Sequence, residues 1–209
     1  MKKIKLVSTL LLSAILLFPA LANADSNSVE DAVQKESIRI ADSYSIGEKL
    51  SEDDLKFIIN HANKVENTQN KSKESKASIQ ALNSDNWNIY GMARTSGGLV
   101  EGQISGDVTV DVGFVSVSVV GDLKAEKIRG SVTAAKVNFR FLAYGIVSTE
   151  SPYVGKVADW SQSGTGKESA SVHISKTTYA AVSVYELFPE GSLTYANGTL
   201  NLTGTPKKQ

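Results

Sequence analysis

The sequence predicts a mainly β protein: an antiparallel β-sandwich preceded by a short α-helical N-terminal arm, with a small open β-barrel as the alternative. From residue 84 onward, apolar side chains recur at every second position, which is the period of a half-buried strand. Twelve aromatic residues lie in residues 84–209, against two in residues 25–83, so the larger core belongs to the second region. Residues 51–66 instead carry apolar side chains at helical spacing.

The first 24 residues have the three parts of a secretory signal peptide. A basic start (MKKIK) is followed by an apolar stretch (LVSTLLLSAILLF) and by the small-x-small end Ala22-Asn23-Ala24. The apolar stretch is shorter than the roughly 20 residues that span a bilayer. We therefore expect cleavage after Ala24 and a secreted, extracellular protein.

Residues 25–66 are expected to form a helical N-terminal arm. Ser51 is a suitable N-cap, and the acidic residues that follow it favour the positive end of a helix dipole. A weaker apolar stripe indicates another helix over residues 28–41. Residues 67–83 are polar, which predicts a flexible linker. The arm is either a propeptide that is removed or a helical cap that stays attached to the all-β domain of residues 84–209.

Individual strands can be placed by their alternation. The clearest is ESASVHIS, in which Ala170, Val172 and Ile174 share one face. The segment YAAVSVYELF predicts a strand with Val182, Val184 and Phe188 inward and Tyr179 and Tyr185 outward.

A hairpin is predicted near the C-terminus. Asn197-Gly198 is typical of a type I′ turn, which would place Tyr195 opposite Leu200.

The valine-rich run GDVTVDVGFVSVSVVGD raises the question of a membrane-entering hairpin. Its alternation changes phase at Gly113-Phe114, which indicates either one bulged strand or two short strands. The following LKAEKIRG carries charge on both faces, which opposes a lipid-facing strand because charge in hydrocarbon is costly. We therefore interpret the run as part of the soluble core.

Composition and motifs argue against several classes of function. The chain contains no cysteine, which fits a bacterial exported protein and excludes thiol chemistry. Signal-peptide cleavage removes three lysines and no acid from a chain of formal net charge +0, so nucleic acid is not an expected partner. The loop SGTGKES lacks the first glycine and the final Ser or Thr of a phosphate-binding loop. We expect no catalytic site, no metal and no cofactor.

Exposed aromatic residues are the remaining candidates for a binding site. Trp160, Tyr153, Tyr179 and Tyr185 lie in or beside strands at positions expected to face outward. Such side chains stack on sugar rings or anchor a protein partner. The sequence thus predicts a non-catalytic, exported interaction protein that binds a cell-envelope polysaccharide, a matrix component or an extracellular protein. The alternative is a secreted, membrane-acting toxin or bacteriocin-like protein, the one case in which a membrane would be the partner.

Overall fold

The structure is a computed structural model that describes residues 26–64, 83–148 and 151–209, with side chains from residue 32. The predicted signal peptide lies outside the described residues. So does the predicted linker, apart from Asn83.

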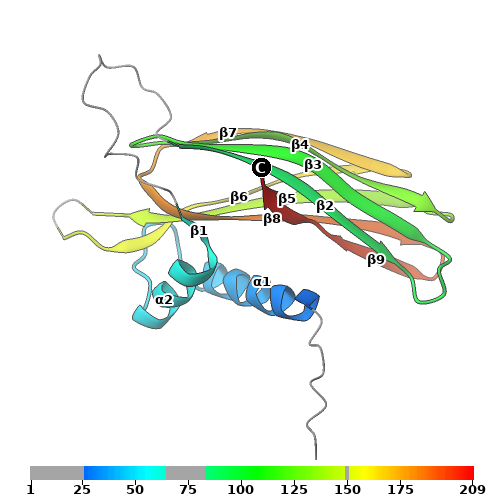
Figure 1. Cartoon of the computed structure of the whole chain (residues 1–209), viewed down its shortest axis with the longest axis horizontal. Coiled ribbons are helices and arrows are strands. Elements are labelled where there is room, and N and C mark those ends of the chain that lie inside the picture. The colour runs from blue at the N-terminus through cyan, green and yellow to red at the C-terminus, as the bar shows by residue number, and fades with distance from the viewer. Residues whose placement is uncertain (1–25, 65–82, 149–150) are drawn as a thin grey trace, which may run out of the picture.

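Two antiparallel sheets face each other and form a β-sandwich that is not closed into a barrel, which confirms the predicted fold class (Figure 1). In the first sheet β8 is central, with β5 and then β6 on one side and β1 and β9 along the other. Its strands are β1 (Asn63–Lys64), β5 (Ala134–Ile146), β6 (Val154–Gly166), β8 (Val182–Tyr195) and β9 (Gly198–Thr203). The second sheet has the order β10-β2-β3-β4-β7. Its strands are β2 (Asn83–Arg94), β3 (Glu101–Val112), β4 (Val117–Arg129), β7 (Ser169–Thr178) and β10 (Thr205–Lys208).

The main core lies between the two sheets and follows the alternation in the sequence. Ala170, Val172 and Ile174 of β7 are buried there, as predicted, while the residues between them are exposed. On β5, Val137 and Phe139 point into the same core and have no exposed surface. Period-2 burial of this kind is what a strand with one covered face produces.

The valine-rich run forms two strands joined by a turn. β3 ends at Val112 and β4 begins at Val117, and the Gly113 amide donates to the Ser116 carbonyl at 2.7 Å. The phase change in the sequence is therefore this turn. The valines on either side of it are buried in the inter-sheet core: Val108, Val110, Val112, Val117 and Val119.

The C-terminal hairpin is present, but its register differs from the predicted one. Tyr195 pairs with Gly198 and Leu193 with Leu200, so the turn residues are Ala196 and Asn197 rather than Asn197 and Gly198. The difference moves each partner by two positions. A two-residue shift keeps every side chain on its own face, so the pattern of apolar residues could not distinguish the two registers.

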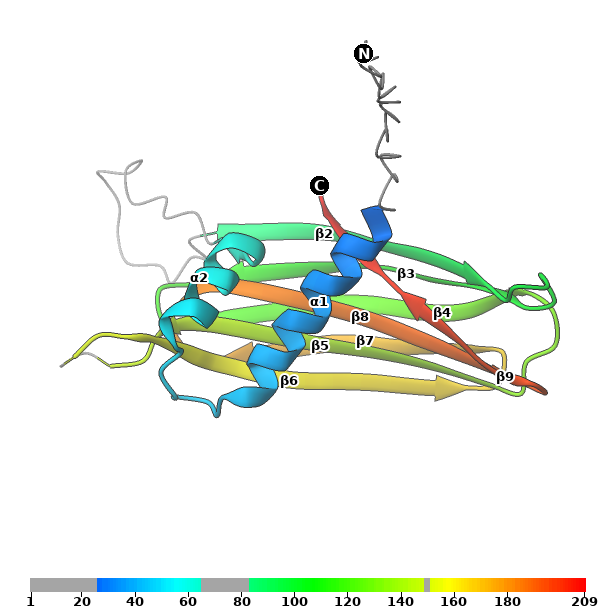
Figure 2. The same ribbon diagram turned by 90° about the horizontal axis from the view of Figure 1, so that it is seen from below.

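The helices cover the outer face of the first sheet. α1 (Ser26–Ser43) runs obliquely across β8, β5 and β6, and α2 (Glu52–His61) follows it (Figure 2). Ser51 caps α2 as predicted, because its hydroxyl accepts from the Asp54 amide. A second apolar cluster joins the helices to the sheet. It comprises Ile40, Ala41, Leu50, Ile58, Ala62, Leu142, Tyr144, Val184 and Phe188.

Val182 packs against the main core as predicted, but from Val184 onward the second cluster reverses the predicted faces of β8. Val184 and Phe188 pack under the helices, whereas Tyr185 and Leu187 point into the core between the sheets. Both faces of the strand are covered, so alternation separates the two sets of side chains but does not indicate which set lies in the main core.

Candidate functional site

Two of the four predicted site residues are buried. Trp160 and Tyr185 lie in the core between the sheets, with 9% and 0% of their surfaces exposed, so the prediction that they face outward is wrong. Trp160 pairs with Phe141 of β5, and paired residues share a face, which turns Trp160 toward the core. Tyr185 is turned inward because the helical arm takes the other face of β8.

Tyr185 belongs to a polar network that links the two sheets. Its hydroxyl donates to Asp85 Oδ2 at 2.5 Å and accepts from Trp87 Nε1 at 3.1 Å. The Lys208 ammonium lies 2.7 Å from Asp85 Oδ1. Burial, together with the bond to Asp85, raises the pKa of the Tyr185 hydroxyl, which therefore remains a donor. The network satisfies a carboxylate that is only 2% exposed, so its role is structural.

Tyr153 and Tyr179 lie at one end of the sandwich. The Tyr153 hydroxyl donates to the Gly47 carbonyl at 2.9 Å, which holds the loop between the helices against the sheet. Tyr179 is 86% exposed. It lines a hollow of about 260 Å³ that also contacts Gly47. These two residues keep the surface position that a ligand-binding role requires.

The same end carries several other exposed apolar side chains. Ile46 and Ile146 line the hollow beside Tyr179. Phe114 and Val115 form the tip of the β3–β4 turn, and Val117, which follows that turn, pairs with Thr178 next to Tyr179. The β3–β4 and β5–β6 turns lie at this end in Figure 1. We call the set Ile46, Phe114, Val115, Ile146 and Tyr179 the apolar end; each member is more than half exposed.

A charged cluster fastens the C-terminal part of α1 to the sheet. Arg140 contacts both Asp42 on α1 and Asp159 on β6, and the buried Lys156 ammonium donates to the Ala41 carbonyl at 2.6 Å and to Asp159 at 3.0 Å. Burial alone would raise the pKa of Asp159, but the bonds from Arg140 and Lys156 hold it below its usual range. The charges pair among themselves, so this cluster also has a structural role.

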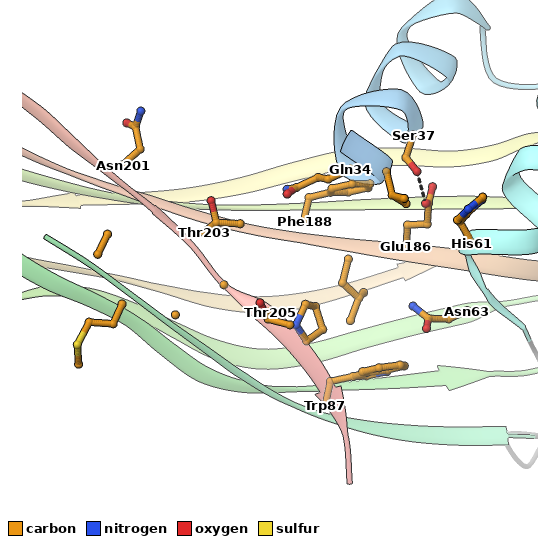
Figure 3. A pocket seen from close by; sticks show the side chains of 17 residues that line it. Gln34, Ser37, His61, Asn63, Trp87, Glu186, Phe188, Asn201, Thr203 and Thr205 are labelled. Carbon is orange, nitrogen blue, oxygen red and sulfur yellow. Dashed lines mark hydrogen bonds between the residues drawn. The ribbon is translucent and has the colours of Figure 1, made fainter. Parts of the chain in front are cut away.

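A groove of about 590 Å³ opens beside β8, between the helical arm and the edge of the second sheet (Figure 3). The groove lies beside a part of the β8 edge that carries no pairing strand among the described residues. β1 pairs with Tyr185 and β9 begins to pair at Glu190, and in the described part of the chain no strand pairs with the β8 edge between them. The chain changes sheet at Gly204, whose amide donates to the Pro189 carbonyl. α1 covers the groove with Val33, Gln34 and Ser37.

Glu186 is the polar centre of this groove. It lies on β8 between Val184 and Phe188, on the face that the helices cover, and is 7% exposed. Ser37 Oγ donates to Glu186 Oε1 at 2.6 Å, whereas Oε2 has no hydrogen-bond partner among the described residues. Burial raises the pKa of the Glu186 carboxyl, while the Ser37 bond and the nearby His61 oppose that rise.

His61 stands beside Glu186 at the end of α2. Its Nδ1 lies 2.8 Å from the Phe57 carbonyl, and its ring stacks on Phe57 with centroids 4.3 Å apart. Because a carbonyl only accepts, Nδ1 carries the proton and Nε2 is an acceptor in the neutral ring. Ser37 bonds to Glu186 and His61 to the backbone, so the three side chains do not have the geometry of a Ser-His-Asp site.

Sequence reasoning missed this groove. Glu186 had a visible signal, since it interrupts the apolar segment YELF, but the groove itself depends on α1 and β9, which are distant in sequence. Within the described ranges, no group of three potential metal-ligating side chains is found. The described helices include none that is long and apolar enough to cross a bilayer. Comparisons with protein-family models, with curated proteins and with solved structures found no match.

Proposed function

We propose that this protein is an exported, non-catalytic interaction protein that contacts an extracellular macromolecule through its apolar end. The observation that carries the proposal is the presence of five exposed apolar side chains in the turns and at a strand terminus of one end, three of which line one hollow. Apolar patches on protein surfaces commonly mark interaction sites, because leaving them in water is unfavourable. The signal-peptide pattern of residues 1–24 supports action outside the cell.

The aromatic members suit the partners expected from the sequence. Tyr179 is the most exposed large apolar residue of the set, and Phe114 is 72% exposed at the tip of a turn. Such rings stack on the faces of sugar units or insert into a pocket on a protein. The partner class is therefore a cell-envelope polysaccharide, a matrix component or an extracellular protein.

A second candidate function uses the same surface. Phe114 and Val115 at the tip of a hairpin could enter a bilayer, as a membrane-acting toxin requires. The valines behind this tip oppose that function because they are buried between the sheets, so inserting the hairpin would break the core. We therefore place membrane action second.

The test compares both ends of the sandwich. The secreted chain is incubated with isolated cell-envelope polysaccharide and matrix material, and separately with dye-loaded liposomes. Tyr179→Ala combined with Phe114→Ser should weaken retention about tenfold. Leu99→Ser changes a residue that is 69% exposed on the β2–β3 loop at the opposite end, and should leave retention unchanged. Dye leakage would instead favour the membrane function, and equal loss in both variants would contradict a role for the apolar end.

A further inference from the structure

The groove beside β8 has the size of a small-ligand site. Its volume of about 590 Å³ lies within the range of ligand pockets, and its walls carry apolar and polar side chains in similar number. The apolar walls come from α1, β8 and β10, with Val33, Phe188 and Pro206 as members. This groove is on the side of the sandwich and shares no residue with the apolar end.

The unpartnered oxygen of Glu186, Oε2, indicates a ligand. A buried carboxylate is costly unless its oxygens are bonded, and native structures satisfy the large majority of buried polar atoms. In Glu186, Oε1 accepts a hydrogen bond from Ser37, whereas Oε2 has no partner among the described residues. Figure 3 shows Glu186 among the lining residues, with Ser37 above it and His61 beside it. The groove thus offers one free, buried acceptor.

The charges around this acceptor favour a cation. The described residues that line the groove include no lysine or arginine, and Glu186 is the one acid among them. His61 has Nδ1 engaged with the Phe57 carbonyl, so the nitrogen left for a ligand is an acceptor in the neutral ring. Asn63 and Gln34 add amide groups, whose oxygens can also accept. A carboxylate with further acceptors around it, and with no lysine or arginine among the described lining residues, is complementary to a charged donor.

A charged donor also fits better than a neutral one. Hydrogen bonds between an ammonium and a carboxylate are roughly twice as strong as neutral ones. A sugar hydroxyl would bond to Oε2 but would leave the buried charge uncompensated. The ammonium of an alkylamine cancels that charge, and its methylene stem can lie on Phe188 and Val33.

We propose that this groove binds a primary ammonium group carried on a short apolar stem, with Glu186 Oε2 as its acceptor. The chemistry is shared by free alkylamines and by lysine side chains of a peptide. Ser37 engages Oε1, so Oε2 is the oxygen of this groove-lining carboxyl that has no partner among the described residues.

The experiment titrates the secreted chain with two ammonium probes by calorimetry. One is n-butylamine and the other is the peptide acetyl-Ala-Lys-Ala-amide. The neutral controls are n-butanol and the same peptide acetylated on its lysine. Each ammonium probe that binds should do so about tenfold or more tightly than its neutral control. Butylamine binding without peptide binding identifies free amines as the source, and peptide binding alone identifies lysine side chains.

Variants then locate the site. Glu186→Gln keeps the shape and the acceptor for Ser37 but removes the charge, and it should weaken ammonium binding at least about tenfold. Glu190→Gln changes an exposed acid on the same strand and should bind as the unmodified chain does. Val33→Trp fills the groove from α1 without altering Glu186, and should also abolish binding. No ammonium binding, equal binding of the neutral controls, or binding that survives both Glu186→Gln and Val33→Trp would overturn the proposal.

Discussion

Glu186 occupies a position that works against folding. A glutamate in water has an ordinary pKa of 4.5, and burial under α1 raises the pKa in the folded protein. The folded state therefore holds this proton more tightly than the unfolded state. Between pH 4.5 and the raised value, stability falls as pH rises, because the carboxyl must ionise in an apolar setting. Residues that destabilise a fold in this way are often kept for binding.

This residue gives a pH-dependent prediction. Glu186→Gln should raise the free energy of unfolding by about 1 kcal/mol at pH 7, because the amide carries no charge to desolvate. At pH 4 the difference should nearly vanish, since the carboxyl is then protonated in both states. Urea denaturation at the two pH values measures it. Glu190→Gln, on the exposed part of β8, should show no such pH-dependent difference; a gain of equal size at both pH values would contradict the account.

At the scale of elements, the helical arm behaves as part of the folded unit. Ile58 of α2 has no exposed surface and packs with Leu142 and Tyr144 of β5. The Arg140 and Lys156 contacts add a charged attachment at the end of α1. Short helices are marginal alone, so α1 and α2 depend on the sheet that they cover.

Ile58→Ala tests this dependence. The cavity and lost burial should lower the free energy of unfolding by about 2–4 kcal/mol. The fluorescence of Trp87 and Trp160 is the readout because both lie in the inter-sheet core, so a shift there shows that the arm and sandwich unfold together. Ile59→Ala, at a neighbouring position that is 40% exposed, should cost less than about 1 kcal/mol. An unchanged tryptophan transition in Ile58→Ala would mean that the arm is independent.

The elements also explain what the sequence could predict. Strands with one covered face, such as β7, were assigned to the correct face because alternation directly reports burial. β8 was assigned to the wrong face because the arm covers the side that the sandwich does not, and no local pattern carries that information. For the valine-rich run the sequence permits two alternatives, because a glycine at a phase change fits a bulge as well as a turn.

The two candidate sites also differ in how far the sequence alone predicts them. The predicted exposure of Tyr179 is confirmed, but the residue lies in the turn between β7 and β8 and not in the predicted strand. The groove was not found, because Ser37 and Glu186 are separated by 149 positions and meet only when α1 crosses β8. The spacing of residues along the sequence does not predict a site that forms only when one element packs on another.

At the scale of the whole molecule, the arm bears on how the protein is processed. The two alternatives from the sequence were a propeptide and a cap that stays attached. Removal of residues 26–64 would uncover the outer apolar face of the first sheet, including Leu142, Tyr144, Val184 and Phe188. Exposing such a face in water is unfavourable by roughly 25 cal/mol per Å². It would also dismantle the groove, which takes Ser37 and His61 from the arm.

We therefore predict that the secreted protein begins at Asp25 and retains the arm. Intact-mass spectrometry of the culture medium should give one species that lacks residues 1–24. Ala24→Trp should block this cleavage, because signal peptidase requires small side chains at the end of the signal, and should leave the full-length chain with the cells. A secreted chain that begins within residues 67–84 would identify the arm as a propeptide and would mean that the groove is lost on maturation. A secreted chain beginning at Met1 would contradict the signal peptide itself, since the cleavage that defines it would not have occurred.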